Sequence, residues 1–236
     1  NRNIDMPKSI KKDEATDNAV AVVEPVTTIV VNNEDVAGDI DRSDILIPSI
    51  QMVHKTSQLA ELHTPGSWVL NQEELLSDGS TPFKLVVLKF RKYYEEDIPY
   101  GDERQARVAD TIQQVTEMGG TTQWNNETNE PPSFNGTGEA IVLVEGKNEA
   151  VFPHEFEDGR RFAMARWIMR KSAFKKAGRK IITDAHLKLT DGLEWGLWEL
   201  SSGKAQAGPN KYFVPVLTLK DRNSEEFAKW ANELSR

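Results

Sequence analysis

The residues best suited to chemistry lie between Gly159 and Lys180, a stretch with nine basic side chains and no acidic one. Three aromatic residues, Phe162, Trp167 and Phe174, are interleaved with them. An aromatic ring can stack on any nucleobase while a nearby cation holds the phosphate, so this mixture suits single-stranded nucleic acid. These nine charges belong to a chain of formal net charge -8, so the rest of the chain carries -17. One positive patch on an acidic protein can still attract a polyanion locally.

The alternation of residues 162–169 gives this stretch two faces if it forms a strand. Phe162, Met164, Arg166 and Ile168 would share the face that we expect to be the core. The other face holds Arg161, Ala163, Ala165, Trp167 and Met169, and we expect it to present Trp167 as a platform for base stacking. An alternative stays open, in which Trp167 and Phe174 are core residues and the cations form a solvated rim.

Basic and aromatic residues also follow the apolar run 83–90, which adds Arg91, Tyr93 and Tyr94 to the candidates. The complete set of candidate nucleic-acid-binding residues is Arg91, Tyr93, Tyr94, Arg161, Arg166, Trp167, Arg170, Lys171, Phe174, Lys175, Lys176, Arg179 and Lys180.

Other kinds of site have little support in the sequence. The four histidines, His54, His63, His154 and His186, are scattered and make no HExxH pair. Gly136-Thr137-Gly138 lacks the third glycine of a dinucleotide site, and no GKS or GKT occurs. Adjacent acids such as Glu73-Glu74 and Glu95-Glu96 are typical of solubilising surface. We therefore expect no metal, no cofactor and no catalytic residue, and a binding protein rather than a conventional enzyme.

The location that we expect is the cytoplasm, or the host cytoplasm if a phage encodes the chain. No cysteine is present, which fits a reducing compartment. No apolar run approaches the roughly 18 residues that a membrane span needs, and residues 1–10 lack the apolar stretch of a secretory signal.

The composition divides the chain into two parts. Residues 1–44 are polar and acidic, with short apolar stretches at 19–23 and 26–31, and predict an extended, flexible arm. Apolar residues become dense from Ile45 onward, so residues 45–236 predict one β-rich binding domain that ends in a helix.

Several elements can be placed within this domain. Residues 83–90 predict a central strand, because both of their alternating faces are apolar. Strands are also expected at 140–144 and 162–169, and a hairpin of 195–200 with 212–219 around the loop 201–210. Helices are expected at 103–118, at 172–178 as a short basic helix or turn, and at the C-terminus with Asn223 as its cap.

About six strands with few helices favour a mainly β, α+β protein over a doubly wound sheet. We expect an OB-like antiparallel barrel with a few peripheral helices and the extended N-terminal arm.

The chain also resembles a known family. IPSIQMVHKTS, the PGSWVLN turn, the central strand, FAMARWIMRKSAFKKAG and NKYFVPVLTL occur in an order similar to that of single-stranded DNA-binding proteins of tailed bacteriophages, which have an OB-like core. The similarity covers most of 45–219. It implies a role in DNA replication or recombination, with Arg166, Trp167, Arg170, Lys171 and Phe174 as contacts. Many single-strand binders end in an acidic tail that recruits partners, whereas residues 231–236 here are not acidic, so we expect recruitment of replication or recombination proteins to fall to the N-terminal arm.

Two other classes remain open. A virion or assembly protein, whose arm contacts neighbouring subunits, would explain an ordered arm better but the basic and aromatic stretch less well. An enzyme of an unrecognised family is third. The partners that we expect are single-stranded DNA, replication or recombination proteins and further copies of the chain, with no membrane partner.

Overall fold

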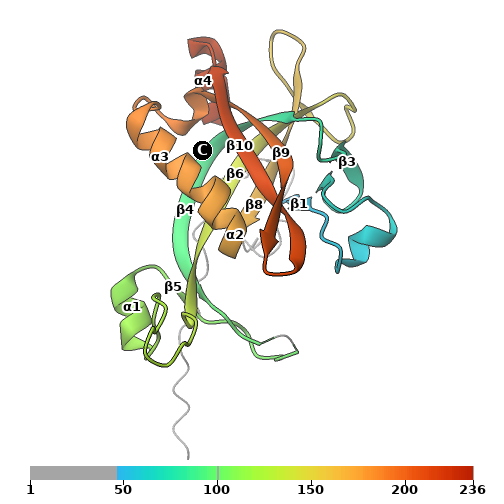
Figure 1. Ribbon diagram of the computed structural model, residues 1–236. Coiled ribbons are helices and arrows are strands. Elements are labelled where there is room, and N and C mark those ends of the chain that lie inside the picture. The colour runs from blue at the N-terminus through green and yellow to red at the C-terminus, as the bar shows by residue number, and fades with distance from the viewer. Residues whose placement is uncertain (1–46, 100, 236) are drawn as a thin grey trace, which may run out of the picture.

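The computed structural model describes residues 47–99 and 101–235 and consists of two antiparallel sheets with short helices packed around them (Figure 1). The predicted arm, residues 1–44, lies outside the described residues. Within the part of the chain that is described, no helix is long and apolar enough to cross a bilayer. The prediction of a mainly β protein with few helices is confirmed.

The larger sheet has seven strands, and its main path runs β10-β9-β4-β6-β8-β7, with β5 paired to β4 off this path. All of its neighbouring strands are antiparallel. The strands are β4 (Phe83–Glu96), β5 (Val108–Ala109), β6 (Phe134–Gly146), β7 (His154–Glu155), β8 (Arg161–Met169), β9 (Gly196–Ala207) and β10 (Asn210–Arg222).

The smaller sheet has three strands, β1 (Ile50–Met52), β2 (Trp68–Leu70) and β3 (Glu74–Ser77), and the short helix η2 (Gln58–Glu61) lies between the first two. Backbone contacts on two sides are among those that link it to the larger sheet. On one side Ser49 forms a parallel bridge with Arg166 of β8. On the other side, after β3, the amide of Ser202 in β9 donates to the carbonyl of Gly79 at 2.8 Å.

The run 83–90 forms the first half of β4, which lies between β9 and β6 as a central strand should. Leu85 and Val87 belong to the main apolar core, whereas Val86 and Leu88 belong to a second core across the sheet. We call the first side the inner face and the second side the outer face. Both are covered, which explains why both faces of this strand carry buried apolar residues.

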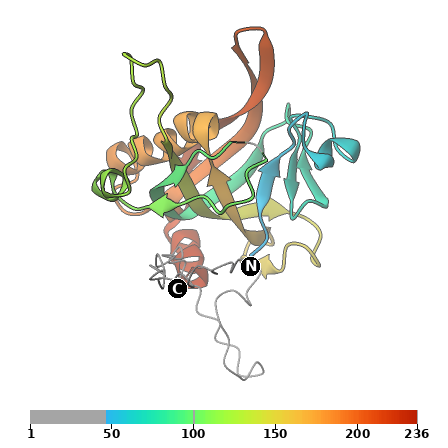
Figure 2. The ribbon, with the colours of Figure 1, turned by 90° about the horizontal axis from the view of Figure 1, so that it is seen from below.

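The inner face is covered by the smaller sheet and by one helical segment, which comprises α2 (Lys171–Ala173), η3 (Phe174–Gly178) and α3 (Arg179–Leu187) (Figures 1 and 2). Phe174 fits over β6 because Gly136 and Gly138 have no side chains there. A Cβ at Gly138 would lie 2.8 Å from the Phe90 ring and 3.2 Å from the Phe174 ring. The two glycines therefore serve packing.

The outer face is covered by α4 (Glu225–Leu234), whose Phe227 and Ala231 pack on β4, β6 and β8. The cap of this helix is Ser224, whose hydroxyl accepts a hydrogen bond from the amide of Phe227. The prediction of Asn223 as the cap was one residue too early. Asn223 instead donates through its side chain to the carbonyl of Glu194 in the helix η4 (Leu193–Trp195).

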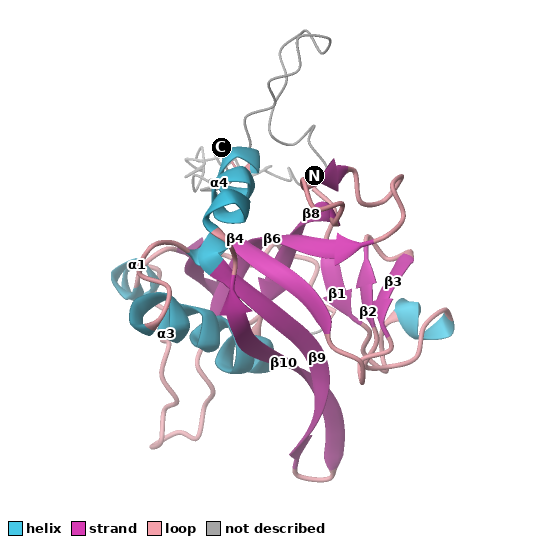
Figure 3. Cartoon of the chain, turned by 90° about the horizontal axis from the view of Figure 1, so that it is seen from above, coloured by secondary structure: helices cyan, strands magenta, loops and turns pink. Residues whose placement is uncertain are grey.

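Two further predictions need correction. The helix expected over 103–118 is only α1 (Ile112–Glu117), which begins at a Thr111 capping box and follows strand β5. The expected loop 201–210 is mostly strand, because β9 and β10 pair from Gly196 with Arg222 to Ala207 with Asn210, with one register shift between Leu219 and Asp221. The resulting hairpin projects from the body of the protein (Figure 3).

Candidate nucleic-acid interface

The strand β8 forms where the sequence predicts it, but its two faces are used differently from the prediction. Ala163, Ala165, Trp167 and Met169 are all buried in the main core. Trp167 is 3% exposed and meets Trp68 edge to face, with ring centroids 5.6 Å apart. The assignment of Trp167 as an open stacking platform is therefore wrong. The open alternative, in which Trp167 is a core residue, fits the structure.

The other aromatic candidates are buried as well. Phe174 is 6% exposed and belongs to the same core as Trp167. Tyr93 and Tyr94 are 7% and 8% exposed, on opposite faces of β4. Burial, with the nearby Glu95 carboxylate, raises the pKa of Tyr93 above its usual value. These rings fill the protein and are not surfaces on which a base could stack.

Most of the candidate cations are held by carboxylates. Arg161 pairs with Glu155 at 2.5 Å, and the others form the pairs Arg91–Asp110, Arg170–Glu95, Lys171–Asp97 and Lys180–Asp184. Arg166 lies 3.8 Å from Glu139. The basic stretch of the sequence is thus divided among different neighbours, and several of its charges are locally neutralised.

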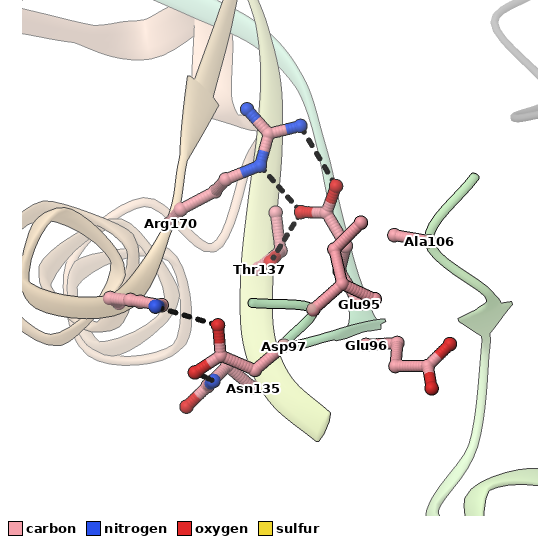
Figure 4. A pocket seen from close by; sticks show the side chains of 9 residues that line it. Glu95, Glu96, Asp97, Ala106, Asn135, Thr137 and Arg170 are labelled. Atoms are coloured by element: carbon pink, nitrogen blue, oxygen red, sulfur yellow. Dashed lines mark hydrogen bonds and ion pairs between the residues drawn. The ribbon is translucent and has the colours of Figure 1, made fainter. Parts of the chain in front are cut away.

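Two of these pairs border an acidic pocket of about 280 Å³ at the end of β4 and β6 (Figure 4). Arg170 donates to both oxygens of Glu95, at 2.5 Å and 2.9 Å, and these hydrogen bonds raise the pKa of the guanidinium. Lys171 reaches Asp97 at 2.7 Å, and Asn135 donates to the same carboxylate at 3.1 Å. Within residues 47–99 and 101–235, no group of three or more acidic or histidine side chains could hold a metal. We interpret this pocket as an ion-paired junction that fixes the start of the helical segment.

Three candidates on the helical segment are exposed and belong to none of these ion pairs, namely Lys175, Lys176 and Arg179, which we call the helix cations. They point away from the core, whereas Phe174, Ala177 and Ile181 on the same segment are buried. Among the described residues, none of the three has an ion-pair partner. They are the part of the predicted site that is open to a polyanion.

The structure adds two cations that sequence reasoning missed, Lys204 and Lys211, the hairpin lysines. Both are exposed. Lys204 is paired in register with Phe213, and Lys211 lies two residues before Phe213, so all three side chains share one face. That face continues, through Pro215 and Leu217, into the inner face of the sheet. The sequence signal for this shared face is the alternation of Lys211, Phe213, Pro215 and Leu217 within the strand.

A cleft of about 340 Å³ lies where β1 separates from β8. The β1–β8 cleft is bordered by Ala173 of the helical segment and Pro215 of the hairpin strand. Its full lining is Ser49, Ile50, Gln51, Met52, His54, Trp68, Arg166, Trp167, Ile168, Arg170, Ala173 and Pro215. Since Ala173 is two residues from Lys175 and Pro215 is four from Lys211, both groups of exposed cations belong to elements that border this cleft.

Comparison with known proteins adds no relative: no protein-family model, no curated protein and no solved structure matches the chain.

Proposed function

We propose that this protein binds single-stranded DNA with little dependence on sequence and acts in phage DNA replication or recombination. The observation that carries the proposal is the position of the helix cations and the hairpin lysines, on the two elements that border the β1–β8 cleft. A single-strand binder needs cations along a groove and apolar or aromatic surfaces for the bases. The cleft and its borders offer both.

An OB-like architecture is part of this proposal. The Ser49–Arg166 bridge and the Ser202–Gly79 hydrogen bond support it, because they would let the smaller sheet complete a wall between β8 and β9. OB folds bind oligonucleotides through a strand face and adjacent loops. Here the corresponding surface would be the inner side of the hairpin beside the cleft.

The charge distribution favours a local interaction over a general one. The chain carries -8 overall, so DNA would be repelled from most of its surface. The five exposed cations would each contact a phosphate, while the bases turn toward the cleft. For single strands the logarithm of affinity falls with the logarithm of salt concentration by about 0.7 per phosphate, so five contacts predict a slope of about -3 to -4.

The test is a fluorescence-anisotropy titration of the full chain with oligo(dT) and with duplex DNA of the same length. The double variant Lys204→Ala/Lys211→Ala should weaken oligo(dT) binding and reduce the salt slope by about one unit or more. Lys147→Ala is the matched control, because Lys147 is exposed and directly follows β6. The loop after β6 lies away from the tip of the β9–β10 hairpin (Figure 1).

A normal affinity of the hairpin variant for oligo(dT) would contradict the proposed path of the strand. Absence of DNA binding by the parent chain at low salt would contradict the function itself and favour the assembly-protein alternative.

A further inference from the structure

The inner side of the hairpin carries an aromatic side chain beside the two hairpin lysines. Lys204 is the register partner of Phe213, and Lys211 lies two positions before Phe213 in β10. Side chains at such positions share one face of a sheet, about 5 to 7 Å apart. Both lysines are exposed, and neither has an ion-pair partner within residues 47–99 and 101–235. Phe213 therefore lies where a strand held by these cations would pass.

The ring of Phe213 is accessible, unlike the rings that the sequence suggested. Phe213 is half-buried, whereas Trp167 and Phe174 are almost completely buried in the main core. Among the described residues, Phe213 makes no contact with another aromatic ring, and no cation lies over it. Part of the ring is thus open to solvent, and neither a second ring nor a cation occupies its face.

The position of the ring is fixed by the turn before β2. Gly66 has a φ of +96°, and a Cβ there would lie 2.8 Å from the Phe213 ring, so a side chain at this position would displace the ring. Ser202, on the same face of the hairpin, donates to the carbonyl of Gly66 at 2.6 Å. A ring that is already held in place loses little conformational freedom when a base stacks on it.

We propose that Phe213 is a stacking surface for one base of the bound single strand, and that Lys204 and Lys211 contact the phosphates beside that base. The inference rests on the proposed function and adds an aromatic contact that the buried candidate rings cannot supply. Every base has a π-face, so stacking on Phe213 strengthens binding without reading the sequence.

Photocrosslinking tests this contact in the unchanged full chain. The probe is oligo(dT) in which one thymine is replaced by 5-iodouracil, a base that couples on irradiation to an aromatic ring stacked on it. Mass spectrometry of the digested adduct should place a crosslink on Phe213. Crosslinks on other residues, with none on Phe213, would overturn the proposal.

Two substitutions in neighbouring positions of β10 give a matched pair. Phe213→Ala should weaken oligo(dT) binding about five- to 150-fold, the range for loss of one base–aromatic stack. Its salt slope should equal that of the parent, because the phenyl ring carries no charge. Phe213→Tyr keeps the ring and should bind like the parent. Tyr212→Ala is the control, because Tyr212 is exposed but lies on the opposite face of the strand, and it should also bind like the parent.

An abasic oligomer separates stacking from a purely structural role of the ring against Gly66. Its deoxyribose phosphate backbone keeps the phosphates but offers no base, so the parent and Phe213→Ala should bind it equally. If Phe213→Ala loses as much affinity for the abasic oligomer as for oligo(dT), the substitution has disturbed the hairpin, and the stacking contact is refuted.

The outcomes distinguish the stacking contact from the function on which it rests. If the parent and Phe213→Ala bind oligo(dT) equally well, the stacking contact is refuted and single-strand binding stands. If the parent fails to bind oligo(dT) at low salt, the proposed function is refuted and the contact with it. A loss in Tyr212→Ala equal to that in Phe213→Ala would refute the assignment of the base to the inner face.

Discussion

Replacing Trp167 with alanine tests the structural role of the stretch that first suggested a binding site. Trp167 is 3% exposed and belongs to the main core together with Trp68 and Phe174. Truncation of a buried Trp costs about 3 to 5 kcal/mol, because the transfer free energy is lost and a cavity remains. The edge-to-face contact with Trp68, about 0.5 to 1.5 kcal/mol for such pairs, is lost as well. We therefore expect the free energy of unfolding of Trp167→Ala to fall by at least about 3 kcal/mol.

Urea denaturation followed by circular dichroism measures this loss. Trp124→Ala is the control, because Trp124 is 52% exposed in the loop before β6 and should change stability by no more than about 0.5 kcal/mol. If Trp167→Ala is unfolded outright, Trp167→Phe should still show an intermediate loss of stability. A loss below about 1 kcal/mol in Trp167→Ala would refute the assignment of Trp167 to the core and restore the stacking prediction.

Three further predictions concern stability. Gly138→Ala should lower the free energy of unfolding by about 1 to 3 kcal/mol in urea denaturation, because its Cβ would lie 2.8 Å from the Phe90 ring; an unchanged midpoint would show that the ring can move away. Hydrogen bonds from Arg107, opposed by burial and aided by Arg104, lower the pKa of Glu96 from about 4.5 to about 2. The ionised carboxylate therefore stabilises the folded protein fully at pH values above the unfolded-state pKa near 4.5, and this contribution is lost as the pH falls toward 2. The urea midpoints of Glu96→Gln and the parent should therefore differ most at neutral pH and converge in acid, and a difference that grows in acid would contradict the sign. Deleting residues 1–41, which the acidic composition marks as an arm, should leave Tm nearly unchanged by scanning calorimetry, and a collapse of Tm would make that segment part of the fold.

Periodicity was sufficient to predict the main strands. The run 83–90 is apolar on both alternating faces, and it forms the part of β4 that is covered on both sides. The same rule explains the error at β8. Phe162 packs beneath α4 on the outer face while Trp167 packs on the inner face, so apolar residues occur on both faces and alternation cannot identify the open one.

The ion pairs could not be predicted from local sequence. Arg170 and Glu95 are 75 positions apart in the sequence. They meet because β4, which contains Glu95, and β8, which precedes Arg170, both pair with β6 in the sheet. The stretch from Arg160 to Lys180 contains no acid, so sequence alone overestimates the number of its cations that are available to a ligand. In the structure the helix cations are exposed members of the predicted basic set that have no ion pair among the described residues, and the hairpin lysines are two further exposed cations.

The hairpin of β9 and β10 was predicted, but its strands were predicted too short because its turn signals indicated a long loop over 201–210. Gly203, Gly208 and Pro209 all favour a loop, but β9 and β10 remain in register through Gly203, and Gly208 with Pro209 forms the connection alone. Cross-strand pairing over this length overrides local turn propensity.

The salt dependence of oligo(dT) binding by the parent chain and by Lys175→Ala/Lys176→Ala/Arg179→Ala measures how many phosphates the helix cations contact. We expect the parent to prefer oligo(dT) to duplex DNA, with a log–log slope of about -3 to -4, and the triple variant to bind more weakly with a slope smaller by about two units. Equal affinity for duplex, or an unchanged slope in the triple variant, would contradict the account.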